Sequence, residues 1–138
     1  MKRTSFIKKI MLIFCALLSI TCYSQEALTA QEEIYTVVEE MPSFPKGQKA
    51  MMKFIQKKIK FPKSAIEKKI MGKCFLNFVV GADGSLTDIK VIQGVKNCPE
   101  CDDAAIKVIS IMPKWIPGRQ KGNAVAVYFN LPINFQYK

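Results

Sequence analysis

The residues of this sequence most suited to chemistry are two cysteines in the stretch Cys98-Pro99-Glu100-Cys101. They precede a predicted helix, and a thiolate at a helix N-terminus has a lowered pKa, which would favour thiol–disulfide exchange through Cys98 and Cys101. In an oxidising compartment the same spacing favours a local structural disulfide, and two free thiols are the remaining interpretation. Redox-active cysteine pairs with this spacing follow a strand in a βαβ unit, and the sequence predicts no such unit here. Zinc would need Cys74 as a third ligand and would leave the site incomplete, so no metal site is predicted.

Few groups suit acid–base or nucleophilic catalysis. The sequence has no histidine, which is the commonest general base and the commonest zinc ligand. It also lacks the glycine-rich phosphate and dinucleotide motifs and the serine and zinc hydrolase motifs. Three of the carboxylates Asp83, Asp88, Asp102 and Asp103 fall at a predicted turn or helix start, where they have structural roles. The sequence therefore predicts a non-enzymatic protein without a cofactor.

Residues 1–24 have the composition of a secretory signal peptide. Basic residues precede an apolar run over residues 10–20, and the small Ser24 suits cleavage before Gln25. The run is shorter than the ~20 residues that a spanning helix needs. We expect cleavage and export to the periplasm. A retained inner-membrane anchor and lipidation at Cys22 are the alternatives, and membrane contact is expected only through an uncleaved leader.

The remaining chain begins with a lead-in and two helices. Residues 25–41 are a polar lead-in, and Ile34–Val38 within it has the character of a short edge strand. Residues 42–138 follow as one domain. A one-sided helix is predicted over residues 47–61 and a shorter helix after Pro62. The many lysines of this region are interpreted as a solvated face, or as an attraction to an anionic surface or an acidic partner.

From Gly72 the apolar period changes to two, which predicts strands. A strand ending at Val80 is followed by a tight turn over residues 81–84 and a return strand. A helix is expected to begin near Asp102, and a closing strand alternates over residues 124–135. The predicted fold class is α+β, with an antiparallel sheet of three to four strands and two to three helices packed on one face.

These elements carry motifs whose order resembles the TonB C-terminal domain family. The shared residues are Phe61-Pro62, Ala65, Gly72-Lys73, Phe78-Val79-Val80, Asp83-Gly84, Ile89, Val91, Ala105, Met112-Pro113-Lys114-Trp115-Ile116-Pro117-Gly118 and Phe135. The similarity covers about residues 42–137. It implies a periplasmic domain of Gram-negative bacteria that captures a short segment of an outer-membrane transporter by strand addition, and so takes part in transmembrane transport.

Strand addition needs a sheet edge whose main-chain groups have no partners. Under the resemblance, the partner-binding edge is the closing strand, at Ala124, Val125, Ala126, Val127, Tyr128, Phe129, Asn130 and Leu131. Ala124 and Ala126 are expected to face outward, and their small side chains permit close approach of a peptide backbone. The alternatives are that the edge is covered within the domain or pairs with a second copy, which would make the protein a homodimerising envelope scaffold.

The sequence departs from the energy-transducing members of this family. Those members carry a histidine-bearing membrane anchor and a long proline-rich spacer. This chain has no histidine, and about twenty residues separate the predicted cleavage site from the domain. We therefore expect a stand-alone periplasmic binding or adaptor protein without energy transduction of its own. No nucleic-acid-binding motif occurs, so nucleic acid is not expected as a partner.

Overall fold

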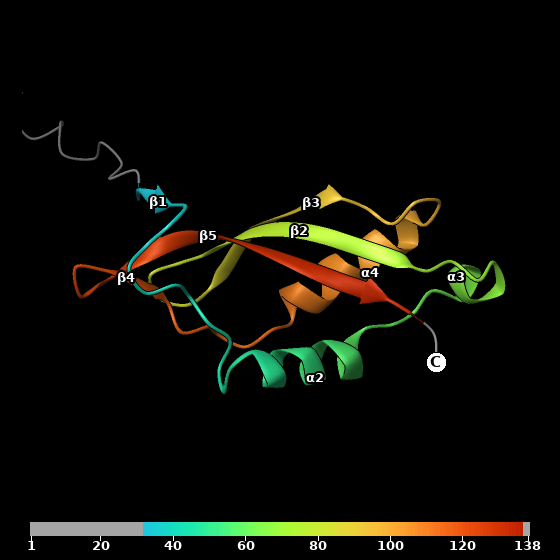
Figure 1. Cartoon of the computed structure of the whole chain (residues 1–138), viewed down its shortest axis with the longest axis horizontal. Coiled ribbons are helices and arrows are strands. Elements are labelled where there is room, and N and C mark those ends of the chain that lie inside the picture. The colour runs from blue at the N-terminus through green and yellow to red at the C-terminus, as the bar shows by residue number, and fades with distance from the viewer. Residues whose placement is uncertain (1–31, 137–138) are drawn as a thin grey trace, which may run out of the picture. The chain divides into compact units, whose positions relative to one another are not determined.

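The computed structural model describes residues 32–136, and the predicted signal peptide lies outside these residues. In chain order the elements are β1 (Ile34–Tyr35), α2 (Gln48–Lys58), α3 (Lys63–Glu67), β2 (Gly72–Val80), β3 (Leu86–Gln93), α4 (Pro99–Ser110), β4 (Gly118–Gln120) and β5 (Asn123–Phe135). Three helices accompany the strands (Figure 1) and share one hydrophobic core with them, which confirms the predicted α+β class.

The longest ladder of the sheet joins β2 to β5. These strands pair antiparallel from Gly72 opposite Phe135 to Val80 opposite Val127, without a register shift. The strand order is β1-β5-β2-β3, and β4 pairs with the start of β5. The three long strands are the predicted ones. The sheet has five strands rather than three to four because the short β1 and β4 also pair with β5.

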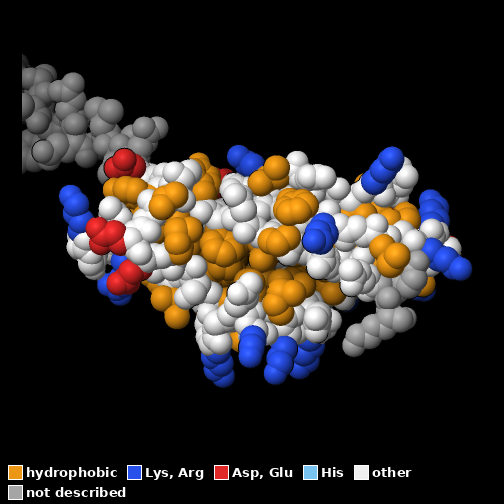
Figure 2. All heavy atoms as spheres, in the orientation of Figure 1, with side chains coloured by type: hydrophobic (Ala, Val, Ile, Leu, Met, Phe, Trp, Pro, Cys, Tyr) orange, Lys and Arg blue, Asp and Glu red, His pale blue; other side chains and the backbone are white. Residues whose placement is uncertain are grey.

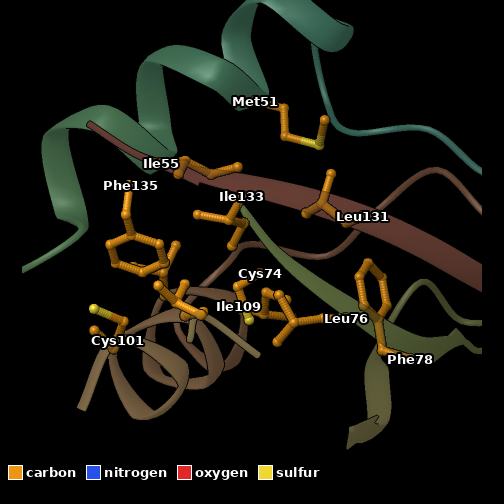
Figure 3. Close-up of a cluster of buried hydrophobic side chains, with 14 of the residues drawn as sticks. Met51, Ile55, Cys74, Leu76, Phe78, Cys101, Ile109, Leu131, Ile133 and Phe135 are labelled. Atoms are coloured by element: carbon orange, nitrogen blue, oxygen red, sulfur yellow. The ribbon is translucent and has the colours of Figure 1, made fainter. Parts of the chain in front are cut away.

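Strand alternation sends one set of side chains into a common core. The residues of this core that come from strands are Cys74, Leu76, Phe78, Val80, Leu131, Ile133 and Phe135. Met51 and Ile55 of α2 close the core from one side, and Ile109 of α4 closes it from another (Figure 3). The helices therefore hold the inner face of the sheet, while alternate strand residues stay on the outer face.

Trp115 closes one end of this core. Its side chain is 3% exposed, and its ring centroid lies 5.4 Å from that of Phe78 and 5.0 Å from that of Phe129. Its main-chain N–H donates a 2.8 Å hydrogen bond to the carbonyl oxygen of Gly84. Trp115 thus ties the segment after α4 to the turn between β2 and β3.

The start of α4 differs from the prediction. The helix was expected to begin near Asp102, but it begins at Pro99, with Cys98 as its N-cap. Proline suits the first helical turn because its missing N–H would have no partner there. The side chain of Asp102 instead accepts a 2.9 Å hydrogen bond from the main-chain N–H of Val95, which ties the preceding loop to the helix.

The close approach of Gly84 to Trp115 generates a stability prediction. Gly84 has φ of 85°, and a Cβ atom there would overlap the main-chain carbonyl of Trp115. We expect Gly84→Ala to lower the free energy of unfolding by about 2–4 kcal/mol, from positive-φ strain plus displacement of the turn. Denaturant unfolding followed by tryptophan fluorescence would measure this loss.

Gly122 provides the matched control. It also has positive φ, 77°, but a Cβ atom there would meet nothing within 4 Å. Gly122→Ala should therefore lower the free energy of unfolding only by the positive-φ strain, about 1 kcal/mol. Equal losses in the two variants would show that contact with Trp115 does not constrain the turn.

Candidate functional site

The two edges of the sheet differ in the regularity of their pairing. β3, the strand at one end of the order, is irregular because its pairing with β2 shifts register between Phe75 and Leu76 and again between Asn77 and Val79. Asp88 in β3 has φ of 50°, in the left-handed region. Such bulges twist an edge and interrupt its row of main-chain groups. β3 is therefore a poor template for an added strand.

The flank of β5 that faces away from β2 is covered only near its start. On this flank β1 runs parallel to β5 and pairs with Ala126 and Val127. β4 pairs with residues 123–125, which lie beyond the end of the β2 ladder. From Tyr128 to Phe135, β5 pairs with β2 alone among the described residues. This uncovered flank, residues 128–135, is about 25 Å long at roughly 3.3 Å per residue.

Some residues of the predicted binding edge are paired with β1 or β4, and the others lie on the uncovered flank. Ala124 and Val125 pair with β4, whereas Ala126 and Val127 pair with β1. Tyr128, Phe129, Asn130 and Leu131 lie on the uncovered flank. Ala126, expected to face an incoming peptide, is only 2% exposed, because β1 pairs beside it. The chain itself thus fills the first half of the edge that the sequence indicated.

Hydrogen bonds between residues far apart in the sequence hold the lead-in beside β4. The main-chain N–H of Glu39 donates to the side-chain oxygen of Gln120 at 3.0 Å. Glu40 and Arg119 exchange two main-chain hydrogen bonds, of 3.1 and 2.8 Å. The sequence signalled a strand at Ile34–Val38, of which Ile34–Tyr35 forms, but no local pattern indicated its pairing partner.

Pro132 indicates which main-chain groups point away from β2. It lies opposite Phe75 in the ladder without a register shift. Main-chain groups alternate in direction along a strand, so alternate residues over 128–134 share the direction of the Pro132 nitrogen. A nitrogen without hydrogen fits where no strand must be paired. The side chain of Asn77 donates a 2.8 Å hydrogen bond to that of Asn130. Side chains lie closest in pairs that exchange no main-chain bonds, so this bond also indicates that the main-chain groups of Asn130 point away from β2.

α2 and the end of β5 form a groove beside the same flank. The lining residues are Met52, Ile55, Gln56, Ile59, Phe61, Pro132, Ile133, Asn134, Phe135 and Gln136, around a volume of about 440 Å³. Figure 2 shows hydrophobic side chains gathered in the hollow between β5 and α2. Ile55 and Ile133 come together from the two elements (Figure 3). The site therefore combines open main-chain groups with an adjacent apolar surface.

Comparison with known proteins identifies the fold. Residues 57–137 match the family described as Gram-negative bacterial TonB protein C-terminal, which covers more than half of the chain. The chain belongs to the TonB C-terminal domain family. No curated protein matches the sequence.

Two solution NMR structures of the Helicobacter pylori TonB C-terminal domain are similar to this one. The structure of residues 194–285 of that protein has 27% identity and a TM-score of 0.50, covering 64% of this chain and 90% of that chain. The structure of its residues 179–285 has 27% identity and a TM-score of 0.47, covering 64% of this chain and 78% of that chain. TonB C-terminal domains are non-enzymatic envelope domains that are associated with transport and interact with outer-membrane transporters.

Two negative findings concern the described part of this TonB C-terminal domain. Within residues 32–136, no helix combines the length and hydrophobicity needed to cross a membrane. In the same residues, no three His, Cys, Asp or Glu side chains are grouped so that they could hold a metal ion. Asp83 accepts hydrogen bonds from the hydroxyl and N–H of Ser85, which hold its pKa below the usual range. Asp83 therefore has a structural role in the turn.

The cysteine pair of this TonB C-terminal domain forms the predicted disulfide. Cys98 and Cys101 are joined within the first turn of α4, and their side chains are 1% and 0% exposed. Disulfide exchange requires an incoming thiolate to reach one of the sulfur atoms. Burial prevents this approach in the folded state, which argues against an oxidoreductase and favours a structural role.

Cys74 is the free thiol of the described residues, and it is fully buried in β2. Burial, the nearby Asp102 carboxylate and a hydrogen bond to it raise the pKa of Cys74 to about 12. At pH 8 the thiolate fraction is then about one part in ten thousand. Because the thiolate is the nucleophile, Cys74 is protected from alkylation by both its pKa and its burial.

We therefore expect native protein to resist iodoacetamide at Cys74 at pH 8 and unfolded protein to react readily. Because the folded pKa lies above the ordinary value of 9.0, the contribution of this thiol to stability is complete below pH 9 and is lost as the pH rises toward 12. Mass spectrometry of alkylated peptides and denaturant unfolding at pH 8 and pH 10.5 would measure the two effects. A Cys74→Ala control should show no label and a smaller alkaline loss. Equal labelling of native and unfolded protein would contradict the assignment.

Proposed function

We propose that this protein is a periplasmic binding module that captures an extended segment of an outer-membrane transporter by strand addition. The observation that carries the proposal is the uncovered flank of β5 over residues 128–135, in a domain whose family interacts with such transporters. An extended peptide pairs with such a flank through main-chain hydrogen bonds, and pockets beside it provide side-chain specificity.

The geometry supports residues 128–135, rather than the first half of the predicted edge, as the place of addition. β1 already pairs with Ala126 and Val127, so an incoming segment meets open main-chain groups only from Tyr128 onward. A strand added there lies about 4.8 Å from β5. Its side chains alternate between the outer face of the sheet and the groove lined by Ile55 of α2 and by Ile59, which follows α2. Apolar side chains at alternate positions of the segment would fill this groove.

Hydrogen exchange tests the binding edge directly. Peptides that tile the periplasm-facing segments of outer-membrane transporters from the same cell would be added to isotope-labelled protein. One or more of them should slow amide exchange at Tyr128, Asn130 and Asn134 by at least about tenfold, because new main-chain bonds protect the amides that point away from β2. Amides of β3 provide the internal control and should not change.

Unchanged exchange over residues 128–135 with every tiled peptide would contradict strand addition. A second copy of the chain could occupy the same flank, so sedimentation would be measured at two protein concentrations without peptide. A stable dimer whose residues 128–135 are already protected would assign the flank to self-pairing and contradict the proposal.

A pair of variants at Asn134 separates main-chain from side-chain contributions. Asn134 is exposed and shares the main-chain direction of Pro132, so Asn134→Pro should remove one donor from the open flank and leave the β2 ladder intact. Loss of one hydrogen bond, about 0.5–1.5 kcal/mol, predicts weaker peptide binding by roughly twofold to tenfold in calorimetric titrations. Asn134→Ala keeps the donor and should bind normally. Equal weakening in the two variants would point to side-chain recognition instead.

We further propose that the protein acts without energy transduction of its own. This follows from the predicted cleavage before Gln25, which would remove the apolar run over residues 10–20 and any link through it to the inner membrane. Mass measurement of the protein recovered from the cell envelope should give a chain that begins at Gln25. Recovery of a chain that retains residues 1–24 would contradict this part of the proposal.

A further inference from the structure

A row of lysines follows the outer side of α2 next to the groove. Lys49, Lys53 and Lys57 are spaced by four residues, so they lie one above another along the helix, and all three are exposed. Lys49 and Lys53 each precede by three residues a side chain that lines the groove, Met52 and Gln56. Residues three apart are neighbours on a helix surface, so the row borders the groove along its length.

These charges have no counterpart within the described part of the protein. No carboxylate of residues 32–136 pairs with Lys49, Lys53 or Lys57, and neither α2 nor β5 contains an acidic residue. Like charges four residues apart repel and slightly destabilise a helix. Lys57 is favourably placed in the last turn of α2, but repulsion within the row opposes this gain, and a ligand with negative charge would relieve the repulsion.

Acidic residues gather at the other end of the uncovered flank. Glu32 and Glu33 lie next to β1, and Glu39 and Glu40 contact the segment around β4. Figure 2 shows acidic side chains at the end of the molecule where β1 and β4 lie, and lysine or arginine side chains along α2. Arg119 and Lys121 lie at the same end, around β4. A carboxylate on an added segment thus meets charges of both signs beside the lead-in, and only positive charges along α2.

We propose that the uncovered flank of β5 selects an extended segment that carries carboxylate side chains beside α2, and that Lys49, Lys53 and Lys57 recognise them. This inference rests on the proposed strand addition. Main-chain pairing by itself is insensitive to sequence, whereas the apolar groove and the lysine row select side chains. Exposed charge pairs are individually weak and are screened by salt, so the three lysines together should change the affinity by about tenfold at low ionic strength.

The experiment compares two synthetic peptides. Both have alternating valine and threonine at their centre, and the residues at both ends are glutamates in one peptide and glutamines in the other, so that the comparison holds for either direction of the added strand. Calorimetric titration of the full protein at low salt should give about tenfold tighter binding for the glutamate peptide. Raising the salt concentration should reduce this preference while leaving the glutamine peptide nearly unaffected, because salt screens exposed charge pairs.

Two triple variants show which lysines cause the preference for the glutamate peptide. Lys49→Gln, Lys53→Gln and Lys57→Gln together should bind both peptides equally, with the affinity of the glutamine peptide unchanged. The matched control, Lys90→Gln, Lys96→Gln and Lys107→Gln, removes the same charge from exposed positions outside α2 and the groove and should retain the preference. Thermal unfolding of the α2 variant should show equal or slightly higher stability, since repulsion within the helix is removed.

The outcomes separate this inference from the proposed function. Equal binding of both peptides by the unaltered protein, with protection of β5 amides, would overturn the charge selection alone. Absence of binding and protection with both peptides would overturn both proposals for these probes. An unchanged preference in the α2 variant would overturn the assignment to the lysine row. Binding to phosphatidylglycerol vesicles without any peptide preference would assign the row to a lipid surface and overturn the proposal.

Discussion

The antiparallel ladder between β2 and β5 is the interaction on which the rest of the structure depends. It joins residues 72–80 to residues 127–135 without a register shift. Side chains alternate along a strand, so a slip of one residue would turn Leu131, Ile133 and Phe135 from the core toward solvent. The helices pack onto the face that this register makes apolar. The same ladder uses one flank of β5 and leaves the other to whatever strand can reach it.

An open flank beside an apolar groove exposes a protein to unwanted pairing, and several features of this domain limit that risk. Pro132 removes one donor from the row, β1 occupies the first positions, and lysines border the groove along α2. Like charges on two copies repel each other, so the lysine row also disfavours association of the domain with itself. The remaining main-chain groups stay available to a segment with complementary chemistry.

The three cysteines of the described domain are buried in its core. Cys98 and Cys101 close the first turn of α4, and Cys74 lies buried near Asp102. Asp102 also accepts a hydrogen bond from Val95, so the disulfide and this carboxylate together hold the loop that leads into α4. The spacing that suggested redox chemistry in the sequence therefore stabilises a helix start, because both sulfur atoms are shielded from an attacking thiolate.

Features that depend on near neighbours in the chain could be predicted from the sequence. Alternation predicted the inward faces of β2 and β5, Gly84 predicted the turn between β2 and β3, and the spacing of Cys98 and Cys101 predicted their disulfide. Which part of β5 stays open depends on the packing of distant segments. Ala126 and Val127 are covered by β1, about ninety residues earlier in the chain, and the groove depends on α2, which is equally remote. Local patterns specify which face of a strand is apolar, but the partner on its flank depends on where distant segments pack.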